Sequence, residues 1–243
     1  ERADRDCVNK TAAGCTVILD FNEGTLRLWD HSALGGAVEL SSVSYPNVEY
    51  THSGWWSEDR QYVILHDELD EQRNGLNTTV HIFDISDLNA PTLVSTWVGP
   101  TSAVDHNGFV RGNKYYMSNY SRGVTVLDLS DPTTPSEIGH FDTFPSVTNA
   151  SFNGAWGVYP YLPSGIILVS DIQGGLYVLK DETQSSSKDD LQLSDTIYEV
   201  TEGEDVTISV TRSGTQAISV DYQMIRGATS SNDFDAIESG TLT

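Results

Sequence analysis

The string TVHIFDISDLNAP at residues 79–91 returns with few changes as GVTVLDLSDPTTP at residues 123–135. Asp84 then coincides with Asp128, and the shared residues keep a constant offset of 44. Each copy alternates apolar and other residues as a strand does and ends in Asp-x-Ser-Asp followed by proline. Asp and Ser side chains bond to turn N–H groups, and proline cannot continue a ladder of hydrogen bonds. Each string therefore predicts a strand followed by a tight turn.

A repeat of this length is typical of β-propellers, in which four-stranded sheets stack around an axis. Weaker copies of the string lie at residues 26–32 and 175–182. A second motif, with a polar pair, a glycine and a large apolar residue, recurs at residues 51–56, 105–110 and 151–156. No long window shows a helical period, so the expected fold class is all-β. We expect about four propeller blades, beginning near residues 7, 50, 104 and 150.

The composition changes after Lys180. Residues 181–190, DETQSSSKDD, are polar and serine-rich, which is typical of a linker. Strand-like alternation resumes in residues 191–243 without the Asp-x-Ser-Asp string. We therefore expect propeller blades in residues 1–180, a linker in 181–190 and a different, sandwich-like β domain in 191–243.

The charge balance excludes some partners. The chain has 13 Lys and Arg against 35 Asp and Glu, a formal net charge of −22. Such a surface repels phosphate backbones, so we expect no nucleic acid partner. It fits cation binding, and it equally fits an acidic surface that is only solvated. No apolar stretch reaches the length of a membrane-spanning segment.

Two cysteines, Cys7 and Cys15, lie eight positions apart near the N-terminus. No further Cys or nearby His completes a zinc-type set. A short disulfide would indicate an oxidising, extracellular compartment, and two free thiols are the alternative.

The second motif supplies the candidate site. If equal spacing means equal placement around the axis, His52 and His106 start inner strands and their imidazoles converge on the central channel. Converging imidazoles suit a transition metal. The acidic segment at residues 66–71 could add His66, Asp67 or Glu68 as ligands. The alternatives are that each His only bonds to a neighbouring blade's backbone, and that the acidic segment is a solvated loop.

With these motifs in view, residues 50–180 resemble the LVIVD-repeat propellers of bacterial choice-of-anchor B surface proteins. The matching stretches include YTHSGWWSEDRQYVILHDELDEQ, VHIFDISDLNAPTLV and AVDHNGFVRGNKYYMSNYSRGVTVLDLSD. The resemblance implies a secreted or cell-surface location and places this chain as the C-terminal part of a larger propeller. It implies no activity, because that of the family is not established.

Residues 191–243 resemble the first half of a Calx-beta domain, a calcium-associated immunoglobulin-like sandwich. The matching stretches are YEVTEGEDVTISVTRSGTQAISVDYQ and GATSSNDFDAIESGTLT. The resemblance implies calcium ligands among the acidic residues Glu202, Glu204, Asp233 and Asp235. Arg226 stands where the family usually has an acidic residue, which weakens such a site.

The function we expect is a secreted or cell-surface scaffold that binds another protein or a carbohydrate, in adhesion or another extracellular interaction. The sequence contains neither a Gly-x-Ser-x-Gly elbow nor a phosphate-binding glycine loop, two motifs that would indicate an enzyme. The competing class is a metal-dependent enzyme that uses His52 and His106 on the propeller axis. An open ring would also expose blade edges, so we expect missing blades or another chain to cover them.

Overall fold

The computed structural model describes residues 16–31 and 36–183, and beyond them only residues 191–193, 201, 207–212, 220–223 and 239–242. The chain forms two compact units, residues 1–186 and 187–243. Several residues named above lie outside the described ranges, so their disulfide and calcium roles stay predictions: Cys7, Cys15, Glu202, Glu204, Asp233 and Asp235.

The first unit is built from four antiparallel sheets whose strands follow one another in chain order. The first sheet holds β1 (Val17–Asn22), β2 (Thr25–Asp30) and β3 (Val38–Val43). The second holds β4 (Thr51–Trp56), β5 (Tyr62–Asp67), β6 (Thr79–Asp84) and β7 (Thr92–Val98). The third holds β8 (Gly108–Arg111), β9 (Lys114–Ser118), β10 (Val124–Asp128) and β11 (Ser136–Phe141). The fourth holds β12 (Ala155–Tyr159), β13 (Ile166–Asp171) and β14 (Gly175–Lys180).

In the second unit the described strands form two antiparallel pairs. One pair joins β15 (Leu191–Leu193) to β16 (Val210–Arg212), and the other joins β17 (Val220–Gln223) to β18 (Ser239–Leu242).

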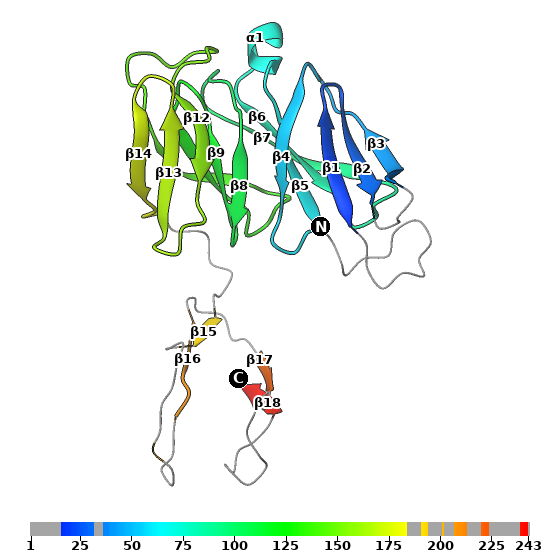
Figure 1. The fold of residues 1–243 in the computed structure, drawn as a ribbon, viewed down its shortest axis with the longest axis vertical. Helices are drawn as coiled ribbons and strands as arrows, with labels where there is room; N and C mark the ends of the chain where they lie inside the picture. Colours follow the sequence, from blue (N-terminus) through cyan, green and yellow to red (C-terminus); the bar gives the residue numbers. More distant parts are fainter. Residues whose placement is uncertain are drawn as a thin grey trace. The chain divides into compact units, whose positions relative to one another are not determined.

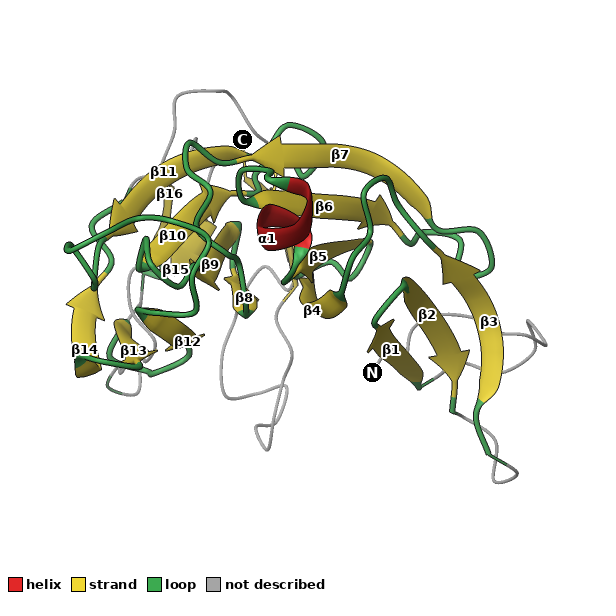
Figure 2. Ribbon diagram, turned by 90° about the horizontal axis from the view of Figure 1, so that it is seen from above, coloured by secondary structure: helices red, strands yellow, loops and turns green. Residues whose placement is uncertain are grey.

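The four sheets of the first unit follow one another around an open arc (Figures 1 and 2). Strands β4, β8 and β12 lie on its inner side, where β4 contacts β8 and β8 contacts β12. Strand β1 contacts β4 as β9 contacts β12. Strands β7 and β11 lie on the outer side (Figure 2). This is the arrangement of propeller blades, and it confirms the all-β prediction.

The repeated strings occupy equivalent positions. Asp84 ends β6 and Asp128 ends β10, and each strand is third in its sheet. Each carboxylate accepts a bond from the N–H two residues on, at 2.7 Å from Ser86 and 2.8 Å from Ser130. The strings thus form the expected strand and turn, closed by the side chain of the Asp.

Apolar side chains between consecutive sheets form three cores. Within each later sheet, one row across three strands faces away from the preceding sheet. The rows are Trp55–Ile64–Ile82, Phe109–Tyr116–Val126 and Tyr159–Leu168–Val178. Val126 is only 6 % exposed because the fourth sheet covers it, whereas Val178 is 60 % exposed. The fourth sheet therefore presents a face of inter-blade type that the described residues leave uncovered.

One short helix, α1 (Asp70–Asn74), departs from the strand pattern. It ends at Gly75, whose φ of 70° is the left-handed conformation that glycine adopts freely and whose N–H bonds to the Glu71 carbonyl. The helix lies in the connection between β5 and β6, above the inner strands (Figure 1).

Candidate metal centre

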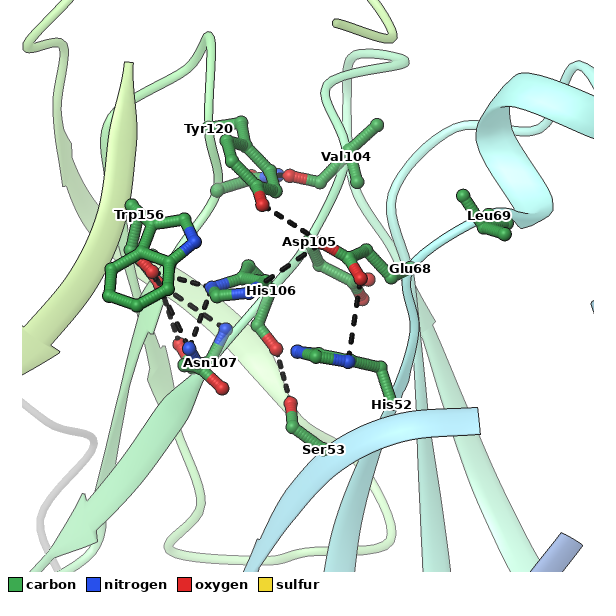
Figure 3. Close-up of polar contacts among 12 residues, drawn as sticks. His52, Ser53, Glu68, Leu69, Val104, Asp105, His106, Asn107, Tyr120 and Trp156 are labelled. Carbon is green, nitrogen blue, oxygen red and sulfur yellow. Dashed lines mark hydrogen bonds and ion pairs between the residues drawn. The ribbon is translucent and has the colours of Figure 1, made fainter. Parts of the chain in front are cut away.

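Three side chains from neighbouring blades meet at one end of the inner strands. His52 lies on β4, Glu68 follows β5, and His106 lies just before β8. One donor atom from each lies within 4.8 Å of the donors of the other two. Figure 3 shows the Glu68 carboxylate reaching toward both imidazoles. Among the described residues, this is the group whose spacing suits a metal ion.

The distances approach those of a coordinated set. His52 Nδ1 lies 3.4 Å from Glu68 Oε2, and His106 Nε2 lies 3.5 Å from Glu68 Oε1. A tetrahedral zinc site with bonds of about 2.1 Å separates its donor atoms by about 3.4 Å. The two imidazoles are stacked, with ring centroids 4.6 Å apart. Little movement would be needed for the three residues to enclose an ion.

His106 has a polar contact at each ring nitrogen. Its Nδ1 lies 2.5 Å from the Trp156 carbonyl oxygen, which can only accept a hydrogen bond, and 2.6 Å from Asn107 Nδ2. Its Nε2 lies 3.5 Å from Glu68 Oε1, a contact that either a proton on Nε2 or a metal ion between the two atoms would satisfy. Burial lowers the pKa of His106, although the Trp156 carbonyl and Glu68 act against this shift. A metal-bound histidine commonly donates its other N–H to a backbone carbonyl.

Glu68 is itself held in place. The Tyr120 hydroxyl donates to Glu68 Oε1 at 2.8 Å (Figure 3). Tyr120 has φ of 29°, a left-handed conformation that a non-glycine residue rarely adopts. Its carbonyl accepts bonds from the N–H groups of Gly123 and Ala155. These bonds join the third and fourth blades and fix the hydroxyl that orients Glu68.

Asp67, named with Glu68 from the sequence, does not join this group. Its buried carboxylate accepts four bonds: the Tyr45 hydroxyl and the N–H groups of Glu49, Tyr50 and Leu69. Because neighbouring residues at the end of a strand point to opposite sides, Asp67 and Glu68 face different partners. Asp67 anchors the chain that leads into β4.

His66 of the acidic segment and Asn153 of the third motif copy also have other partners. His66 is fully buried and its Nε2 bonds to the Tyr115 hydroxyl at 2.8 Å. Asn153, which replaces His in the fourth blade's copy of the motif, bonds to Ser151 and Gln173. The candidate ligands therefore come from the second and third blades. The Tyr120 hydroxyl and the Trp156 carbonyl hold two of them in place.

The acidic segment that contains Glu68 is not a solvated loop. Asp67, Asp70 and Glu71 are buried, and Asp105 is buried beside them. Burial first, and then mutual repulsion, raises the pKa of Glu71 and of Asp105. Raised pKa values favour the neutral carboxyl groups, and a cation nearby would favour the carboxylates instead.

No sequence pattern indicated Tyr120 or the Trp156 carbonyl. Both reach the site through contacts more than 45 residues apart along the chain. Asp105 carried a weak signal, because it directly precedes His106 in the repeated motif.

Comparison with known proteins supports the fold. Residues 109–143, which span almost all of the third sheet, match the LVIVD repeat. No curated protein matches the chain. The described architecture is that of a β-propeller, and residues 109–143 are similar to one LVIVD repeat.

Solved structures resemble the chain at low identity. A candidate 6-phosphogluconolactonase from Bacteroides fragilis aligns with a TM-score of 0.50 at 15 % identity, over 68 % of this chain and 46 % of that one. The periplasmic gluconolactonase PpgL from Pseudomonas aeruginosa gives 0.47 at 15 %, over 73 % and 56 %. The Cps50 (Swd1) β-propeller domain from Myceliophteria thermophila gives 0.45 at 13 %, over 69 % and 52 %. The chain thus spans about half the length of these structures, and the likeness concerns the fold alone.

Proposed function

We propose that this β-propeller binds one transition-metal ion through His52, Glu68 and His106. The observation that carries the proposal is the meeting of two imidazoles and one carboxylate within 4.8 Å, with His106 Nε2 facing Glu68 Oε1 at 3.5 Å. Two histidines and one carboxylate form a common set for zinc and for non-haem iron.

Three protein ligands also leave a coordination position open. In zinc proteins this distinguishes catalytic sites from structural ones, which have four protein ligands. His52 is part-exposed, so the open side is reachable from solvent. This supports the second candidate, a metal-dependent enzyme in which the bound ion would supply Lewis acidity. The protein's own part would be to hold the ion and orient Glu68 through Tyr120.

Metal titration of the chelator-treated protein tests the proposal. We expect one equivalent of Zn²⁺ or Co²⁺ to bind, with a cobalt absorption spectrum that reports nitrogen and oxygen ligands. His52→Ala, Glu68→Gln and His106→Gln should each weaken binding by more than about 100-fold.

His140→Ala is the matched control. His140 also lies 3.5 Å from a glutamate, Glu137, but on an exposed strand and without a third ligand. It should bind metal as the unchanged protein does. Equal binding by Glu68→Gln and the unchanged protein would contradict the proposal, as would no binding at all.

We also propose that the chain acts outside the cell, as part of a choice-of-anchor B type protein. The LVIVD match and the stretches quoted above support this. The Calx-beta resemblance of residues 191–243 supports an immunoglobulin-like sandwich there, with calcium bound near Glu202 and Asp233. The expected partners are a protein or a carbohydrate at the cell surface. Peptide mapping of exported protein without reduction should find Cys7 joined to Cys15.

Finally, we propose that further blades or another chain cover the ends of the arc. The uncovered row at Tyr159, Leu168 and Val178 supports this, because the equivalent rows of two other blades are covered. The back of the first sheet is different: there Asp20 bonds to Trp29 and Arg27 pairs with Glu39. A second copy joined head to tail would therefore place an apolar face against a charged one.

A further inference from the structure

Three carboxyl groups lie buried beside the metal centre and take no part in it. Asp70 and Glu71 come from α1, and Asp105 comes from the segment before β8. All three are almost fully buried, and Asp105 has an exposed fraction of 0 %. Glu71 and then Asp70 are the charges that act most strongly on Asp105, so the three groups are close neighbours.

Most of their oxygens have no partner. Asp70 Oδ1, Glu71 Oε2 and both carboxylate oxygens of Asp105 accept no hydrogen bond, which makes four unpartnered oxygens. Two contacts link the groups: a side-chain hydrogen bond between Asp70 and Glu71, and the Asp105 N–H, which lies 3.4 Å from Glu71 Oε1. No Lys or Arg in the described ranges forms an ion pair with any of the three.

Such an arrangement requires either that the carboxyl groups are protonated or that a positive charge compensates them. A buried carboxylate without hydrogen bonds or a counter-ion is strongly unfavourable, and native proteins rarely leave buried polar oxygens unpaired. The Asp105 side chain is the clearest case, because it is wholly buried among other carboxyl groups and both of its oxygens are free of partners.

We propose that Asp70, Glu71 and Asp105 form a second cation site, for a hard divalent ion of the Ca²⁺ type. The donors are all oxygen, which suits calcium and not the softer ions that imidazoles prefer. Calcium takes six to eight oxygen ligands, and the four unpartnered oxygens supply at least half of them. This site is separate in residues and in chemistry from the His52–Glu68–His106 group.

Binding would draw the carboxylates together. The three groups do not meet within the 4.8 Å that joins the donors of the metal centre. Ionised carboxylates repel one another, and an ion at their centre would offset that repulsion. The five-residue helix α1 carries two of the three and is the element expected to shift.

Calcium titration of the chelator-treated full chain tests the site. All five tryptophans (Trp29, Trp55, Trp56, Trp97 and Trp156) lie in the first unit, so tryptophan fluorescence reports its unfolding and not that of residues 187–243. At free calcium about 100-fold above Kd, the melting temperature should rise by about 5 to 10 °C. Asp105→Asn and Glu71→Gln should each abolish this rise.

Controls separate this site from the others. Glu39→Gln, a charge removal on exposed strand β3, should keep the full rise. Glu202→Gln should also keep it, because any calcium bound there stabilises the second unit. His52→Ala should lose zinc or cobalt binding but keep the calcium rise, and Glu71→Gln should show the reverse.

Three results would overturn the second site. One is an unchanged melting temperature in calcium. Another is a rise that persists in both Asp105→Asn and Glu71→Gln. The third is that these two variants are at least as stable as the calcium-loaded protein and insensitive to the ion, which would mean that the carboxyl groups are simply protonated.

Discussion

The uncovered face of the fourth sheet gives a sharp test, because the repeat supplies its own control. Val126 and Val178 occupy the same position in two successive blades, each on the third strand of its sheet. Val126 is 6 % exposed and Val178 is 60 % exposed. The same substitution, valine to alanine, can therefore be made at a covered and at an uncovered copy of one site.

The expected costs follow from burial. Valine to alanine removes the equivalent of two methylene groups, worth about 1.6 kcal/mol at about 0.8 kcal/mol each when fully buried. At Val126 the packed neighbours cannot close the space, so a cavity contribution raises the loss of unfolding free energy to about 2–3 kcal/mol. At Val178 only the buried share counts and no closed cavity forms, which leaves about 0.6 kcal/mol.

Urea and thermal unfolding followed by tryptophan fluorescence measure both losses in the first unit. Val126→Ala should lower its melting temperature by roughly 4 to 10 °C, and Val178→Ala by at most about 2 °C. Equal losses at the two positions would refute the reasoning, since Val178 would then be covered in solution. A Val178 loss that grows with protein concentration would identify a second copy as the cover.

Two other local features can be tested by substitution. Burial lowers the pKa of His81 to about 4, so as the pH falls below the ordinary value of 6.5 the unfolded chain is protonated before the folded one. The free energy of unfolding should therefore fall by about 2 kcal/mol between pH 7 and pH 5. His81→Gln should remove that part of the acid sensitivity, as measured in urea titrations. Gly154 has φ of 92°, and in Gly154→Ala the added Cβ would clash with the Tyr120 carbonyl oxygen. This variant should lower the free energy of unfolding by about 2 kcal/mol or more, and it should weaken metal binding by displacing Tyr120. Gly165→Ala, with φ of 77° and nothing within 4 Å of the added Cβ, carries the strain alone and should leave metal binding unchanged; equal metal affinity in both variants would show that Tyr120 does not position Glu68.

The repeat made much of the first unit predictable. The period placed Asp84 and Asp128 at the ends of equivalent strands, and the alternation of apolar residues determined which side chains face the next sheet. It could not show the face that lacks a neighbour, because Val178 looks like Val126 in the sequence and differs in what lies opposite and in standing on the edge strand of its sheet. The pattern within a strand shows which apolar side chains lie on one face, and it does not show whether another sheet packs against that face.

The candidate site was predictable only in part. His52 and His106 follow from equal placement of one motif around the arc, and Glu68 from the acidic segment beside them. Choosing Glu68 over Asp67 requires knowing where β5 ends, because one residue reverses the side to which a strand side chain points. Tyr120 and the Trp156 carbonyl depend on packing between blades, and local sequence carries no record of that packing.

The site arises where the blades stop being alike. The connection equivalent to residues 68–78, between β5 and β6, has two residues in the first sheet (23–24), five in the third (119–123) and three in the fourth (172–174). The second sheet's connection is eleven residues long, and it supplies Glu68, Asp70 and Glu71. The third sheet's connection supplies Tyr120.

A tight hairpin of two or three residues can only close a strand pair, whereas a longer connection can return side chains to the inner end of the neighbouring blade. Repetition builds a rigid frame whose equivalent positions are nearly interchangeable. Chemistry that needs three different donors at one point must come from the segments in which one blade differs from the next. In this propeller those segments converge beside His52 and His106, which is why both proposed cation sites lie at one end of the same two blades.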